Sequence, residues 1–111
     1  YYTYPEDWTK SFYGARDALS NLLTYGDVSE KDKAAAKADY AALQKDIMEE
    51  FAEMKAAVAA ADTKEAKQAA ATTASNKMSE KVYEKTVKMY NKLQKKQEAR
   101  AWFGSLLNKN S

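Results

Sequence analysis

Apolar residues recur at helical spacing along most of this chain, and strand-like runs of β-branched and aromatic residues are absent. The clearest pattern lies between residues 30 and 61, where large apolar side chains follow one another at steps of three and four. They are Tyr40, Leu43, Ile47, Phe51, Met54 and Val58. Ser29 and Asp32 match a capping box just before this stretch. The sequence therefore predicts a long helix over residues 30–61 with one buried face.

A first helix is expected from Pro5 to about Thr24, because proline suits the first turn of a helix and Tyr25-Gly26 is a stop signal. Its apolar positions also recur at helical spacing. They are Trp8, Phe12, Ala15, Leu19, Leu22 and Leu23.

A third helix over about 63–74 is expected after a cap at Asp62, with Glu65 completing a second capping box. The likeliest break follows at residues 72–76, and a last helix then covers residues 76–107. Its apolar face is formed by Met78, Val82, Thr86, Met89, Tyr90 and Leu93. Without that break, the third and fourth helices merge into one.

Short connections between such helices favour antiparallel neighbours. We therefore predict an all-α protein with one domain over residues 1–111, built as an up-down-up-down four-helix bundle. Three long helices are the alternative architecture. Residues 1–5, which include three tyrosines, are a candidate flexible tail.

Composition narrows the possible chemistry. The chain has no cysteine and no histidine, which excludes disulfides, zinc-thiolate sites and histidine-assisted nucleophilic catalysis. We expect no catalytic residue, metal ion or cofactor. The net charge is +2, but residues 1–62 carry −5 and residues 63–111 carry +7. This asymmetry indicates either attraction between the two halves of the chain or an acidic partner.

Lysines form a stripe roughly opposite the apolar face of the last helix. They are Lys77, Lys81, Lys85, Lys88, Lys92, Lys95 and Lys96. We interpret the stripe as an electrostatic docking surface for an acidic partner, and a solvated helix face partly paired with nearby carboxylates is the alternative. Nucleic acid is a weaker candidate because arginine is scarce. Membrane binding is weaker too, because the apolar face of this helix is needed for the core.

The last helix ends in a cluster of four large apolar residues, Trp102, Phe103, Leu106 and Leu107. On a straight helix, Trp102 and Leu106 project on the lysine side. We favour a bend near residues 97–100 that folds the cluster over the end of the bundle; exposed anchors beside the lysines are the alternative. The candidate partner-binding residues are therefore the seven lysines together with Arg100, Trp102 and Phe103.

The first predicted helix carries Asp17, Leu19, Leu22 and Leu23, and the charged turn Asp27–Asp32 leads from it to a long alanine- and acid-rich helix. In this layout the first two predicted helices resemble those of the small helical extrinsic subunits of photosystem II, of the PsbQ-like, algal or diatom type. The lysine-rich stretch KVYEKTVKMYNKLQKK is also similar to the last helix of such bundles.

The resemblance implies a non-enzymatic, extrinsic protein without a cofactor of its own, cleaved from a targeting peptide and located in the chloroplast thylakoid lumen. Such a protein supports oxygen evolution by shielding the manganese–calcium cluster and retaining calcium and chloride. Its implied partners are the photosystem II core or other extrinsic subunits, and it reaches the membrane through protein contacts. We expect a monomer when it is free. A free-standing interaction bundle, such as a secreted effector or scaffold, is the alternative.

Overall fold

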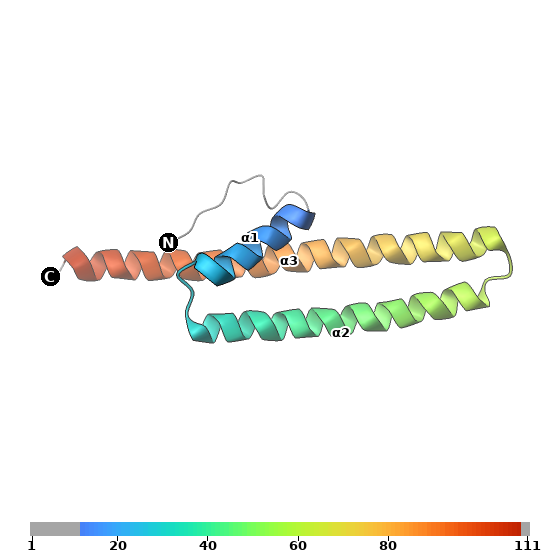
Figure 1. Ribbon diagram of the computed structural model, residues 1–111, viewed down its shortest axis with the longest axis horizontal. Coiled ribbons are helices and arrows are strands. Elements are labelled where there is room, and N and C mark those ends of the chain that lie inside the picture. Colours follow the sequence, from blue (N-terminus) through green and yellow to red (C-terminus); the bar gives the residue numbers. More distant parts are fainter. Residues whose placement is uncertain (1–11, 110–111) are drawn as a thin grey trace.

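The computed structural model describes residues 12–109, and the side chains of residues 14–107. It contains three helices, α1 (Phe12–Tyr25), α2 (Glu30–Ala60) and α3 (Lys64–Lys109). The two long helices form an antiparallel hairpin, and α1 packs against α3 near the open end of this hairpin (Figure 1). The described secondary structure is entirely helical, so the all-α prediction is confirmed.

The bounds of α2 agree with the prediction to within one residue. Ser29 caps the helix as expected, since its Oγ accepts a hydrogen bond from the backbone N–H of Asp32 at 3.1 Å. At the other end, the Lys67 ammonium donates a hydrogen bond to the carbonyl oxygen of Val58 at 2.8 Å. This places a positive charge beside the negative end of the α2 dipole and ties the tip of the hairpin together.

The four-helix bundle is not confirmed, because the described residues form three helices and the predicted break at residues 72–76 is absent. The third and fourth predicted helices are one helix of 46 residues. No glycine or proline lies between Gly26 and Gly104, and the alanine-rich start of α3 has high helix propensity. The cap of α3 is Thr63 rather than Asp62, since the Thr63 Oγ1 accepts from the Ala66 N–H at 3.0 Å.

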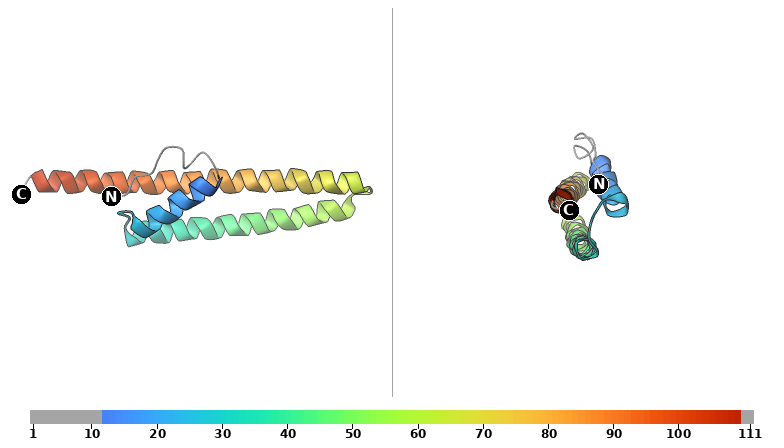
Figure 2. Two further views of the ribbon diagram at one scale, coloured as in Figure 1. Left: turned by 45° about the horizontal axis from the view of Figure 1, so that its top comes forward. Right: turned by 90° about the vertical axis from the view of Figure 1, so that its left-hand side faces the viewer.

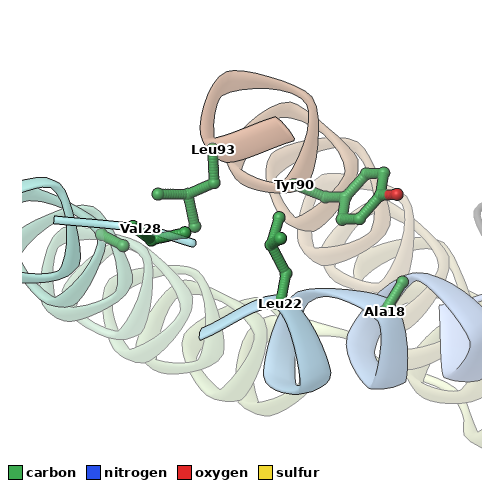
Figure 3. Packing of buried hydrophobic residues seen from close by; sticks show 6 residues of the cluster. Ala18, Leu22, Val28, Tyr90 and Leu93 are labelled. Carbon is green, nitrogen blue, oxygen red and sulfur yellow. The ribbon is translucent and has the colours of Figure 1, made fainter. Parts of the chain in front are cut away.

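The core lies where all three helices overlap (Figure 3). Its buried members come from every helix and from the connection between α1 and α2. They are Ala18, Leu22, Val28, Ala36, Tyr90 and Leu93. The molecule measures 73 × 26 × 16 Å, and its radius of gyration is 19.0 Å. A compact chain of this length would have a radius of gyration of about 13 Å, so the protein is elongated and its core is thin.

The predicted apolar face of α2 is only partly buried. Leu43 is buried, and Ile47, Met54 and Val58 are half-buried. Tyr40 and Phe51, however, keep 54% and 44% of their surface exposed. Burial of these two residues was predicted wrongly because α1 is short and crosses α3 obliquely, which leaves much of the hairpin uncovered (Figure 2). The predicted start of the first helix at Pro5, with Trp8, and the candidate tail lie outside the described residues.

A polar side chain of α3 holds the connection between α1 and α2 in place. Gln97 is fully buried; its Oε1 accepts from the backbone N–H of Asp27 at 3.0 Å, and its Nε2 donates to Gln94 Oε1 at 3.0 Å. Gly26 packs closely beside it, because a Cβ at this position would lie 2.4 Å from the Leu22 carbonyl oxygen and 3.1 Å from Gln97 Oε1. The tight turn after α1 therefore requires glycine for space.

Candidate docking surface

The predicted lysine stripe divides into two groups, and one of them faces α2. Lys81 lies 2.6 Å from Glu50, and Lys92 lies 3.6 Å from Asp39. Eleven residues, or about three helical turns, separate both the two lysines and the two acids. The antiparallel hairpin thus brings the acidic flank of α2 against one edge of the stripe. Some of the excess positive charge of residues 63–111 is therefore paired with acidic residues of the first half of the same chain.

Lys96, the third lysine on the α2 side of the stripe, and Arg100 lie at the open end of the hairpin. Arg100 donates from Nε to Asp27 Oδ1 at 3.0 Å, next to the hydrogen bond made by Gln97. Lys96 lines a small hollow together with Asp32 and Asp39.

The ion pair between Lys81 and Glu50 is the least exposed one in the described part of the chain. The Glu50 side chain is 14% exposed, and its Oε2 is buried without a hydrogen-bond partner. The hydrogen bond to Glu50 raises the pKa of Lys81 above its ordinary value of 10.5. Desolvation opposes this shift, and the negative charges of Glu50, Asp46 and Glu53 add to it. The pair therefore positions α2 against α3, and we assign Lys81 to the fold as well as to the stripe.

We expect Lys81→Met to lower the free energy of unfolding more than Lys85→Met, because it leaves the Glu50 carboxylate without its cation. Since folding raises the pKa of Lys81, the pair stabilises the fold below pH 10.5 and its contribution is lost as the pH rises through the raised value. Urea unfolding near neutral pH and above that value measures both effects. An equal loss for the two variants would contradict this assignment.

The other lysines of the stripe are available to bind another protein. Lys77, Lys85, Lys88 and Lys95 are exposed, and none has a carboxylate of the described residues within 4.0 Å. Three of them are spaced by eleven and seven residues, which are close to whole numbers of helical turns. Lys77, Lys88 and Lys95 therefore form a straight line on α3, which we name the outer lysine row.

Trp102 follows Lys95 by another seven residues and continues this line. It belongs to a C-terminal apolar cluster that consists of Trp102, Phe103, Leu106 and Leu107. These side chains are 61%, 58%, 43% and 69% exposed, in that order. The rings of Trp102 and Phe103 pack edge to face, with centroids 4.9 Å apart. Trp102 and Leu106 thus share one face with the outer lysine row, over about 38 Å from residue 77 to residue 102, and Phe103 lies at the edge of that face.

The predicted bend near residues 97–100 is wrong. α3 runs without interruption to Lys109 and extends past the ends of both α1 and α2 (Figure 1). A Cβ added at Gly104 would meet no atom within 4 Å. The cluster does not close the core, because the buried Gln97 and the Arg100–Asp27 pair already complete that end of the bundle. The exposed alternative for the cluster is the one the structure adopts.

Gln97 is the important residue that sequence reasoning passed over. It follows Leu93 by four residues, so it continues the apolar face of α3. A glutamine on the apolar face of a helix indicates a buried side chain that forms specific hydrogen bonds.

Within residues 12–109, no three histidine, cysteine, aspartate or glutamate side chains are grouped so that they could hold a metal ion. No helix in this same range has the length and apolar character needed to cross a membrane. The chain matches no known protein-family model, and neither the curated proteins nor the solved structures include a significant match to it.

Proposed function

We propose that this chain is a non-catalytic docking protein that binds an acidic protein surface through the outer lysine row and the C-terminal apolar cluster. The observation that carries the proposal is the alignment of the outer lysine row with Trp102 and Leu106 on one face of a helix that projects beyond the rest of the fold. Three of the four exposed lysines that have no carboxylate of the described residues within 4.0 Å, namely Lys77, Lys88 and Lys95, are in line with Trp102.

Such a surface combines two properties of protein interfaces. A row of unpaired lysines speeds the approach of an acidic partner and disfavours basic ones. Exposed aromatic and aliphatic side chains supply the apolar contact that holds a complex after it has formed. Binding through this surface is expected to weaken with salt, because charges further apart than about 8 Å are largely screened at physiological ionic strength.

We further propose that the partner is the lumenal face of photosystem II, where the protein would help to retain calcium and chloride for oxygen evolution. The partner and the thylakoid lumen come from the resemblance of residues 11–54 and of the lysine-rich stretch to the PsbQ-like extrinsic subunits. Asp39 and Glu50 on the acidic flank of α2 already form ion pairs with lysines of α3. We therefore favour α3 over that flank as the surface that contacts the partner.

Release and rebinding from oxygen-evolving membranes tests this function. Raised salt should remove the protein, and oxygen evolution should then depend on added calcium and chloride until the purified chain is returned. Retention at high salt, or unchanged activity after release, would argue against photosystem II as the partner. Salt-sensitive binding to a different acidic protein, with none to these membranes, would identify a free-standing interaction module instead.

A further inference from the structure

A second apolar surface lies on the hairpin, away from the outer lysine row. On one side of the hairpin, α2 and α3 are joined by the two ion pairs of Lys81 and Lys92. The other flank of α2 carries exposed apolar side chains instead. The short helix α1 runs obliquely and lies beside only part of the hairpin (Figure 2). Tyr40 is 54% exposed, Met48 72% and Phe51 44%.

Two adjoining hollows run along this flank. One has a volume of about 410 Å³ and is lined by Tyr40, Leu43, Ile47, Met48 and Val82, with Gln44. The next has a volume of about 370 Å³, shares Ile47 and Met48 with the first, and continues to Phe51 and Lys55. Together they form an apolar groove, named here the α2 groove. From Tyr40 to Lys55 it is about 23 Å long, which corresponds to roughly four turns of a helix.

The charges beside the α2 groove are positive. Lys37 and Lys55 are 18 residues apart, which is five helical turns, so they lie on the same line of α2 as Gln44 and Met48. The Lys55 ammonium lies 4.7 Å from the centre of the Phe51 ring. Asp39 and Glu50 are directed away from this rim, because they pair with lysines of α3.

We propose that the α2 groove receives an acidic amphipathic helix of a partner protein. The length of the groove suits a helix of about four turns, a common mode of peptide recognition. The two lysines favour carboxylates on the flanks of that helix, and the flexible Met48 side chain can adapt to its apolar face. α1 lies against the same hairpin further along, so the hairpin already accommodates a third helix. This surface is separate from the outer lysine row and adds to the proposed function.

The chain has no cysteine, so Met48→Cys allows an environment-sensitive dye to be attached at one position of the full-length protein. The probes are two synthetic helical peptides of about four turns with the same leucine positions, one with glutamates and one with lysines elsewhere. We expect the acidic peptide to shift the dye emission to the blue and to bind about tenfold more tightly than the basic one.

Two variants keep the outcome interpretable. Lys37 and Lys55 are exposed, so the double variant Lys37→Glu, Lys55→Glu should keep the helical circular dichroism of the parent. It should bind the basic peptide more tightly than the acidic one. Leu107→Glu, on the C-terminal apolar cluster, is the matched control and should bind as the parent does.

Equal affinity for both peptides, or binding of neither, would overturn the proposal. A dye that is already shielded in the free chain and becomes exposed when residues 1–11 are deleted would show that this chain fills its own groove, and the partner helix would be rejected. Concentration-dependent dimerisation that shields the dye would assign the groove to a second copy and would reject it too.

Discussion

Replacing Leu22 by alanine is expected to lower the free energy of unfolding by about 3 kcal/mol, the usual cost of a cavity at a fully buried leucine. Leu22 has no exposed surface and packs in the cluster that contains Tyr90 and Leu93 (Figure 3). A domain of this size has a total stability of about 5–15 kcal/mol. One truncation therefore removes a large part of the stability, because few other residues secure α1 to the hairpin.

Leu107→Ala is the matched control for this prediction. It removes the same atoms from a side chain that is 69% exposed, so the free energy of unfolding should change by no more than about 0.5 kcal/mol. Urea unfolding followed by circular dichroism compares the two variants. Equal losses would mean that the cluster around Leu22 is not the core, or that the C-terminal apolar cluster is packed against the fold.

The second large effect concerns the outer lysine row. Reversing three charges with Lys77→Glu, Lys88→Glu and Lys95→Glu should raise the dissociation constant for salt-washed photosystem II membranes on the order of 100-fold, since one exposed ion pair changes an equilibrium constant by up to about fivefold. The folded state should persist, because these exposed side chains have no carboxylate of the described chain within 4.0 Å.

A control with the same change of net charge is Lys31→Glu, Lys45→Glu and Lys64→Glu, at exposed positions away from the row. We expect this variant to rebind with only a small loss of affinity. If the two triple variants rebind equally well, the interaction depends on overall charge, and the outer lysine row has no special part in it.

Features that depend on local sequence signals could be predicted from the sequence. α2 was predicted well because Ser29 and Asp32 mark its start and a steady apolar pattern fills its length. α3 was harder, because the stretch around residues 66–76 contains alanine and small polar residues. Such a stretch has no apolar pattern that would distinguish a continuous helix from two helices with a break.

The division of the lysine stripe could not be predicted, because it depends on the register between α2 and α3. Spacing within one helix shows that Lys81 and Lys92 share a face, and it shows the same for Asp39 and Glu50. Only the short turn after Ala60 sets which residues of the two helices lie opposite each other. The position of the C-terminal apolar cluster depended on another long-range feature, namely how far α3 extends past its neighbours.

The most direct test of docking through α3 is photo-crosslinking from a single position. A benzophenone attached through Trp102→Cys should crosslink to a photosystem II subunit when the chain rebinds to salt-washed membranes, and raised salt should abolish the product. The same group attached through Ala57→Cys, at an exposed position near the tip of the hairpin, should give little product. Crosslinking from Ala57→Cys but not from Trp102→Cys, with both variants bound, would contradict the account.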